Sequence, residues 1–166
     1  MAIEARGEYQ FDDILRGIRL LWRGQKAVMG ISLFIGPMIL LSTIGDYILG
    51  KQSLVSHLPG LFVGGFLTSN YWWITWMSSR KLWKSNLNLH GTTAFHFDES
   101  GFQLTGANAQ SEVRWAGILK WKEGKDVFLL FCSPQIAHIV PKRFFSDGGQ
   151  MDAARQLFAE KITRLK

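Results

Sequence analysis

Two long uncharged runs dominate the first half of the chain. They span residues 27–45 and 58–79, and no Asp, Glu, Lys or Arg interrupts either one. As helices they would reach about 28 and 33 Å, close to the roughly 30 Å hydrocarbon thickness of a bilayer. The pattern therefore predicts a transmembrane helical hairpin. A hairpin buried in a soluble core is the alternative, but soluble helices usually carry charge on their solvent face.

Basic residues cluster at the two outer flanks of the predicted hairpin. The loop between the runs, residues 46–57, carries Lys51 as its single basic residue. The flanking cations are Arg16, Arg19, Arg23, Lys26, Arg80, Lys81 and Lys84. Because cytoplasmic loops carry an excess of Lys and Arg, both termini are expected in the cytoplasm. The predicted location is a membrane, with the lipid bilayer as one partner and both termini on its cytoplasmic side.

Aromatic and basic side chains mark the predicted cytoplasmic boundary of the bilayer. Indole rings combine an apolar body with one N–H donor and favour the headgroup level. The residues expected at this interface are Trp22, Trp72, Trp73, Trp76, Arg80, Lys81, Trp83 and Lys84. An alternative is that Trp72 and Trp76, four residues apart, pack against another helix. The sequence allows both interpretations.

A short amphipathic helix is predicted just before the first run. Phe11, Leu15, Ile18 and Trp22 share one helical face, and charged residues share another. This spacing predicts a helix that lies on the membrane surface. The first 13 residues are polar and net acidic, and they lack the basic start and apolar core of a cleaved signal peptide.

From about residue 87 the pattern changes to short segments with β character. Phe95 and Phe97 alternate with neighbours of the opposite face, as expected for half-buried strands. Turn residues at 98–101 and 123–126 predict hairpins. Near the C-terminus an apolar helical stripe comprises Met151, Ala154, Phe158, Ile162 and Leu165. Asp147 or Ser146 is the expected N-cap of that helix.

The predicted fold class is an α+β membrane protein in two parts. Residues 1–85 form the amphipathic helix and the transmembrane hairpin, and residues 86–166 form a cytoplasmic domain. Strands followed by one terminal helix predict a small, bent antiparallel sheet that the C-terminal helix caps.

Charge and composition limit the possible chemistry. The 19 Lys and Arg residues exceed the 13 Asp and Glu residues by six, but most of this excess flanks the predicted spans. A nucleic-acid partner is therefore not expected. The scattered histidines and the single Cys132 offer no metal-ligand spacing and no disulfide. We expect no cofactor, no metal and no enzymatic activity, because no catalytic motif stands out.

Three stretches carry a family resemblance. The sequences FHFDESGFQLTG, VRW and DVFLLFCSPQIAHIVPKRFF, followed by the terminal helix, resemble the YcxB-like family of bacterial membrane proteins. The resemblance implies two spans followed by a cytoplasmic pleckstrin-homology-like (PH-like) domain. It equates Trp115 with a recurrent tryptophan and residues 141–145 with the basic motif before the helix. Ala116 and Gly117 depart from the polar or acidic residues of many relatives.

Within that framework, residues 141–145 have two interpretations. In the structural one, Pro141 ends a strand, Phe144 or Phe145 fills the core, and the two cations between them are solvated. In the functional one, those cations contact a partner or lipid headgroups. The alternation with Val113 predicts that Trp115 is mainly a core residue.

The favoured function is a non-catalytic, membrane-tethered module for protein interaction. The expected partner or headgroup contacts are Lys120, Lys122, Lys142 and Arg143. The partner is an unidentified protein or another copy of the chain. One alternative is an anionic-lipid-binding domain, although Asp98 and Glu99 in the first hairpin would repel phosphoinositides. Another is an inner-membrane immunity protein that neutralises a toxin.

Overall fold

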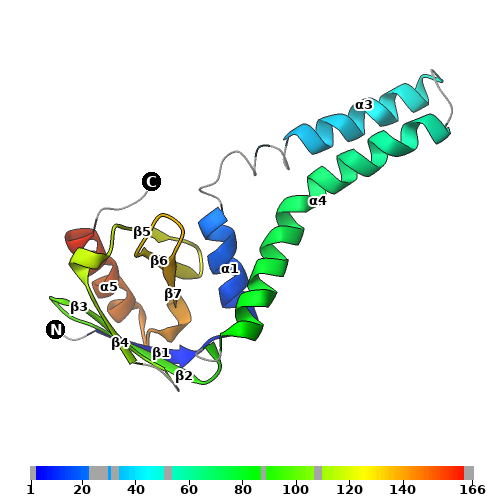
Figure 1. Ribbon diagram of the computed structural model, residues 1–166. Helices are drawn as coiled ribbons and strands as arrows, with labels where there is room; N and C mark the ends of the chain where they lie inside the picture. The colour runs from blue at the N-terminus through cyan, green and yellow to red at the C-terminus, as the bar shows by residue number, and fades with distance from the viewer. Residues whose placement is uncertain are drawn as a thin grey trace. The chain divides into compact units, whose positions relative to one another are not determined.

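The chain divides into two compact units. The computed structural model describes residues 3–22, 30, 34–50, 54–86, 89–106 and 110–162 (Figure 1). One unit, here called the sheet unit, comprises Met1–Leu21 and Ser79–Lys166. The other, the helical unit, comprises Trp22–Ser78. The sheet unit is thus built from both ends of the chain.

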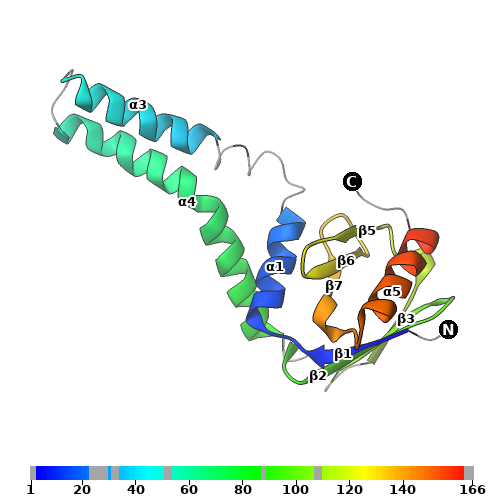
Figure 2. The same cartoon turned by 180° about the vertical axis from the view of Figure 1, so that it is seen from behind.

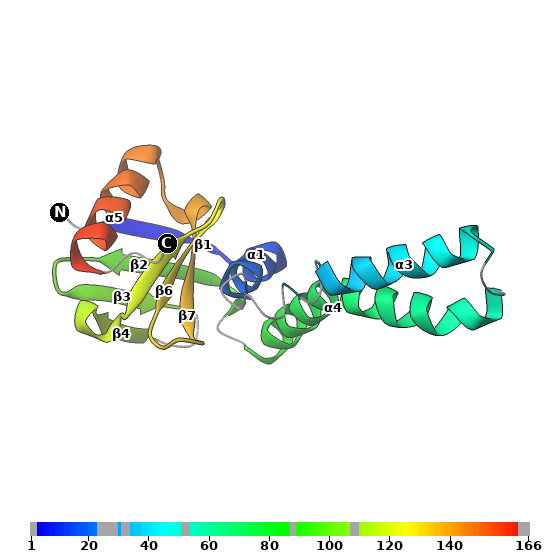
Figure 3. The same cartoon turned by 90° about the horizontal axis from the view of Figure 1, so that it is seen from above.

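Two antiparallel sheets form the sheet unit. The first has the order β1-β2-β3-β4, with β1 (Ile3–Glu8), β2 (Thr92–Phe97), β3 (Gly101–Thr105) and β4 (Gln110–Arg114). The second has the order β5-β6-β7, with β5 (Lys120–Glu123), β6 (Val127–Phe131) and β7 (Ala137–Pro141). The 3-10 turns η3 (Trp115–Gly117) and η4 (Lys142–Phe144) flank the second sheet in sequence. The strands of the two sheets cross one another, and α5 (Gly148–Lys161) lies beside them (Figure 3).

The core between the sheets is largely aromatic. Strands β2, β3, β5 and β6, the turn η3 and helix α5 all contribute rings, among them Phe95, Phe97, Phe102, Trp115, Trp121, Phe128 and Phe158. The Trp115 side chain is 7% exposed, and its Nε1 donates a hydrogen bond to the main-chain oxygen of Asp98 at 2.9 Å. The indole therefore fills the core while its one polar group is satisfied. The predicted core role of Trp115 is confirmed.

Strand β6 is buried along its whole length. Phe128 and Leu130 point into the aromatic core, whereas Val127, Leu129 and Phe131 form a second apolar cluster with Leu20. Leu20 belongs to α1 (Phe11–Trp22), and α1 and α5 lie on opposite sides of the second sheet (Figure 2). The continuous run VFLLF follows from this, because a strand covered on both faces needs apolar side chains at every position.

Helix α1 is a packing element of the sheet unit. Ile14, Ile18 and Leu20 are buried, and a Cβ on Gly17 would lie 2.5 Å from Cδ1 of Ile139. Helix α1 therefore packs on the second sheet through Gly17 and Leu20. Of the apolar face expected to lie on a membrane surface, Ile18 is buried, whereas Phe11, Leu15 and Trp22 are only partly buried. The spacing predicted the helix but not the sheet that it packs against.

Strand β1 was not predicted, and it shifts the domain boundary. Ile3 and Ala5 are buried and alternate with exposed Glu4 and Arg6, and β1 pairs antiparallel with β2 from Ile3↔Phe97 onward. The expected division into residues 1–85 and 86–166 thus gives way to a unit that includes both chain ends. A six-residue strand whose partner lies far along the chain leaves little local signal.

The helical unit contains α3 (Gly36–Ile48) and most of α4 (Leu54–Ser85). The two helices approach closely where glycines allow it. A Cβ on Gly36 would lie 2.6 Å from the Thr68 main-chain nitrogen, and one on Gly64 would lie 2.8 Å from Cγ of Leu40. Small residues at such crossings let the backbones come together.

The predicted transmembrane hairpin is contradicted. Among the described residues, no helix combines the length and the apolar character that crossing a membrane requires. Helix α3 has 13 residues, and part of the first predicted span lies outside the described residues. Helix α4 is long enough, with 32 residues, but it contains polar Ser69 and Asn70 amid its glycines and tryptophans. The prediction treated uncharged residues as apolar, and the two are not equivalent.

The placement of α1 gives a stability prediction. Ile14→Ala should lower the free energy of unfolding by about 2–4 kcal/mol, because it deletes a buried side chain. Leu15→Ala, on the face expected to meet lipid, should cost less than about 1 kcal/mol because Leu15 is only partly buried. Urea unfolding of the full chain, followed by circular dichroism in mild detergent, measures both. An equal or larger effect of Leu15→Ala would contradict the packing of α1 on the sheet.

Candidate binding surface

The corner formed by residues 141–145 joins β7 to α5. Pro141 ends β7, and residues 142–144 form η4. Phe144 and Phe145 are both buried, and Phe145 forms an isolated antiparallel bridge with Ala5 of β1. The prediction that a phenylalanine of this segment fills the core is confirmed, and both residues do so.

Lys142 is held by contacts within the chain. Its Nζ lies 2.6 Å from Oε1 of Glu123 and 5.0 Å from the centre of the Phe128 ring. Its main-chain N–H donates to the carbonyl oxygen of Asp126 at 2.9 Å. The cation thus ties the corner to the β5–β6 hairpin through side chain and backbone together.

Arg143 ties the same corner to the N-terminal elements. Its Nη2 lies 2.6 Å from Oδ2 of Asp13 and also donates to the main-chain oxygen of Glu8. The hydrogen bond to Asp13 raises the pKa of the Arg143 guanidinium. Asp13 is buried, and its Oδ2 accepts a second hydrogen bond from the Gln10 N–H at the start of α1. The buried carboxylate therefore has the charged partner that its burial requires.

These contacts decide between the two interpretations of the corner cations only in part. The view that Lys142 and Arg143 are merely solvated is wrong, because Lys142 forms an ion pair with Glu123 and Arg143 forms one with Asp13. Their contact with a partner stays a prediction. Any such contact would have to compete with the internal pairs.

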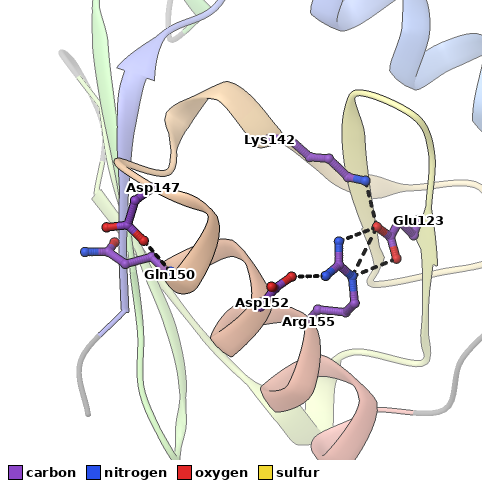
Figure 4. Close-up of polar contacts among 6 residues, drawn as sticks. All are labelled: Glu123, Lys142, Asp147, Gln150, Asp152 and Arg155. Atoms are coloured by element: carbon purple, nitrogen blue, oxygen red, sulfur yellow. Dashed lines mark hydrogen bonds and ion pairs between the residues drawn. The ribbon is translucent and has the colours of Figure 1, made fainter.

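Glu123 is the centre of an ion-pair cluster. Besides Lys142, it accepts hydrogen bonds from Arg155 of α5, at 2.9 Å from Nη2, and Arg155 also pairs with Asp152 (Figure 4). The hydrogen bonds from Arg155, and to a smaller degree Lys142, lower the pKa of Glu123 to about 2 against the opposing effect of burial. At neutral pH the cluster joins β5, η4 and α5 through one ionised carboxylate.

Asp147 caps the start of α5. Asp147 adopts an extended conformation, and its Oδ1 accepts a hydrogen bond from the Gln150 N–H at 2.8 Å (Figure 4). The predicted N-cap is confirmed at Asp147. This hydrogen bond holds the pKa of the Asp147 carboxyl below its usual value, so the cap stays charged and complements the helix dipole.

Lys120 and Lys122 share one face of β5. They alternate with the buried Trp121, and they pair in register with Phe131 and Leu129, so they point away from the aromatic core. Nζ of Lys120 lies 5.2 Å from the centre of the Phe131 ring. Both lysines are partly exposed. They lie on the strand that ends at Glu123, which brings all four predicted contact residues to the second sheet.

The residues predicted at a membrane interface fall into different settings. Trp72, Trp73 and Trp76 are exposed on α4 within the helical unit, and Trp22 ends α1 partly buried. Arg80, Lys81 and Lys84 are exposed on the last turns of α4.

Trp83 is a packing residue of the sheet unit. Its ring lies 6.4 Å from Phe11 and 4.6 Å from His90, both at edge-to-face angles. The side chain is only partly exposed, which fits these contacts.

Sequence reasoning missed the residues that pair with Lys142 and Arg143, and it missed Arg155. Asp13, Glu123 and Arg155 lie far apart along the chain, so no local spacing could indicate them. Within the described part of the chain, no group of three or more His, Cys, Asp or Glu side chains is placed to hold a metal ion. The polar groups that the fold gathers here are paired cations and carboxylates.

Comparison with known proteins bears on the same region. Residues 97–158 match the model of the family described as YcxB-like protein. This match supports the resemblance of the chain to the YcxB-like family. The YcxB-like segment begins at the end of β2 and ends within α5, so it contains Glu123, Lys142, Arg143 and Arg155 but not Asp13. No curated protein and no solved structure gives a significant match to the chain.

The lowered pKa of Glu123 gives a pH-dependent stability prediction. A carboxyl with a depressed pKa in the folded state stabilises it above the unfolded pKa, near 4.5, and loses that contribution as pH falls toward about 2. Glu123→Gln should therefore destabilise the protein at pH 7, and its difference from wild type should shrink below pH 4.5. Urea midpoints at pH 7, 4.5 and 3 measure this.

The matched control is Glu160→Gln near the end of α5, because the exposed ion pair of Glu160 with Lys161 contributes little to stability. It should leave the urea midpoint near that of wild type at each pH. A Glu123→Gln difference that stays constant from pH 7 to pH 3 would rule out the ionised cluster as its source.

Proposed function

We propose that this chain is a non-catalytic protein of the bacterial inner membrane whose sheet unit binds a protein partner at the cytoplasmic face. The observation that carries the proposal is the exposed apolar surface of the helical unit. Its most exposed large side chains are Phe34, Leu41, Ile48, Val55 and Phe62, each more than 70% exposed. Surfaces of this kind usually meet a membrane or another protein.

The proposal requires that the helical unit attaches to the membrane surface, and it does not require a helix that crosses the membrane. The exposed tryptophans Trp72, Trp73 and Trp76 add amphipathic rings of the kind that favour the headgroup region. Arg80, Lys81 and Lys84 add exposed positive charge that anionic headgroups attract. With attachment from the cytoplasmic face, both termini lie in the cytoplasm.

We also propose that the sheet unit is PH-like. Four-stranded and three-stranded antiparallel sheets that cross, with a helix after the last strand, support this, as does the YcxB-like match. Folds of this size host many functions, so the function has to be argued from the surface.

A protein partner is favoured over an anionic lipid as the ligand of the sheet unit. In the β2–β3 hairpin, hydrogen bonds from Ser100 and Gly101 lower the pKa of Asp98, and a hydrogen bond from Lys161 lowers that of Glu99. Both carboxylates are therefore ionised at neutral pH and would repel anionic headgroups. Lys120 and Lys122, on the second sheet, suit acidic groups of a partner protein.

Membrane attachment is tested with double variants in which two exposed apolar side chains are replaced by polar ones. Phe62→Gln with Phe66→Gln changes two exposed side chains one turn apart on α4, and it should shift the full chain from the membrane fraction toward the soluble fraction. The matched control is Leu119→Gln with Ile136→Gln, which changes two exposed apolar side chains of the sheet unit and should leave fractionation unchanged. Fractionation of bacterial cells and liposome flotation measure the effect.

Two results would overturn the attachment. One is wild-type protein that remains in the soluble fraction and fails to float with liposomes. The other is an equal loss of binding in both double variants, because then the helical unit would have no special role.

The partner surface is tested by charge reversal on β5. Lys120→Glu with Lys122→Glu should reduce the recovery of proteins cross-linked to the full chain in native membranes by about tenfold. The matched control is Arg6→Glu, an exposed cation on β1, which should retain them. Thermal melting of each variant verifies folding.

Three outcomes distinguish the candidate functions. Unchanged cross-links in the β5 variant reject that surface. If the variant instead loses affinity for phosphatidylglycerol vesicles while its cross-links persist, lipid binding replaces protein binding. Identification of a membrane-active toxin among the lost cross-links would specify the partner as a toxin and the function as immunity.

A further inference from the structure

Strand β4 is an unpaired edge of the first sheet. In the order β1-β2-β3-β4 its one neighbour is β3, and no other described strand pairs with it. It has no proline and no bulge in its register with β3. Edge strands of this kind present free main-chain groups to any chain that can pair with them.

The outward main-chain groups belong to Glu112 and Arg114. The Trp115 N–H donates to the carbonyl oxygen of Ser100 on β3 at 3.1 Å. Because N–H and C=O groups alternate in direction along a strand, those of Val113 also point to β3. The N–H and C=O groups of Glu112 and Arg114 therefore point away from the sheet.

The side chains of β4 divide by charge and polarity. Glu112 and Arg114 are exposed on the outer face and form no hydrogen bond or ion pair with the residues that the structure describes. Val113, between them, is partly buried on the inner face and packs against the aromatic core. The sequence Glu-Val-Arg thus has opposite charges on either side of one apolar residue.

We propose that β4 pairs antiparallel with β4 of a second copy of this chain, with the two-fold axis at Val113. In that register each Glu112 lies opposite Arg114 of the other copy, and the two residues exchange main-chain hydrogen bonds. Both charged pairs are attractive, and the two valines meet on the inner face. The interface is isologous and joins the two first sheets into one continuous sheet.

The opposite charges of Glu112 and Arg114 select this register. They also favour a second copy of the chain as the partner that pairs with β4. An axis at Glu112 would place two carboxylates opposite each other, and an axis at Arg114 would place two guanidinium groups opposite each other. The segment is complementary to itself only about Val113. The proposal goes beyond the proposed function, since it depends neither on membrane attachment nor on the Lys120 and Lys122 surface.

Cysteine cross-linking in the full chain tests the register. With the native Cys132 changed to Ser, Val113→Cys should form a disulfide dimer on oxidation, because opposed residues have Cα atoms about 4.5–5.5 Å apart. Ser111→Cys is the matched control. Its two copies would lie roughly 13 Å apart in this register, too far for a disulfide.

Charge exchange tests the pairing itself without cysteines. Glu112→Arg or Arg114→Glu alone replaces attraction with repulsion twice in the dimer and should weaken the dimer about tenfold or more by sedimentation. The double variant Glu112→Arg with Arg114→Glu should restore dimerisation, because it exchanges the partners and keeps opposite charges opposed. Both measurements use the full chain in mild detergent.

The proposal fails if the wild-type chain is monomeric at micromolar concentration, or if Ser111→Cys cross-links as readily as Val113→Cys. It also fails if the single charge reversals dimerise like wild type. If the double variant stays as weak as the single ones, Glu112 and Arg114 are not opposed and the register is rejected. Loss of membrane attachment in the Phe62 and Phe66 variant would leave each of these results unaffected.

Discussion

The double-sided burial of β6 is the constraint on which the sheet unit depends. Val127, Leu129 and Phe131 require a cover on one face, and Phe128 and Leu130 require one on the other. The second cover is the aromatic core with α5, and the first is α1, which lies before the helical unit in sequence. Because apolar side chains left in water would cost roughly 1.5–3 kcal/mol each, the N-terminal elements are part of this fold.

The ion pairs at the corner after β7 follow from the same arrangement. Arg143 reaches Asp13 at the start of α1, and Lys142 reaches Glu123 at the end of β5. Each pair holds together elements that the apolar clusters have already brought close. Removal of Arg143 would leave the buried carboxylate of Asp13 without its charged partner, which is more destabilising than the pair is stabilising. The two cations therefore connect α1, β5 and α5 to one short segment.

The two units differ in how their apolar residues are used. In the sheet unit, Leu119 and Ile136 are the large apolar side chains that stay mostly exposed among the residues described. In the helical unit, exposed apolar side chains occur along both α3 and α4. Polar Ser69 and Asn70 and the glycines keep α4 below the apolar character of a membrane span. This contrast is why we propose attachment through the helical unit and binding through the sheet unit.

The sequence by itself determined the features that depend on near neighbours. Alternation gave the strands around Phe95 and Phe97, the helical stripe gave α5, and the N-cap rule gave Asp147. The motif around residues 141–145 predicted a buried phenylalanine and a resemblance to the YcxB-like family, whose model matches residues 97–158. Each of these signals involves residues that are only a few positions apart in the chain, such as the periods of strands and helices.

Only the tertiary structure decided the partners of those elements. Strand β1 pairs with residues about ninety positions away, and Asp13 meets Arg143 across 130 positions. An apolar helical face can pack on a sheet or on a lipid surface, because the hydrophobic effect is non-directional. The sequence of α1 therefore does not indicate which of the two it contacts. The uncharged runs misled for a related reason: they recorded missing charge, whereas a bilayer selects for apolar side chains over about 20 residues.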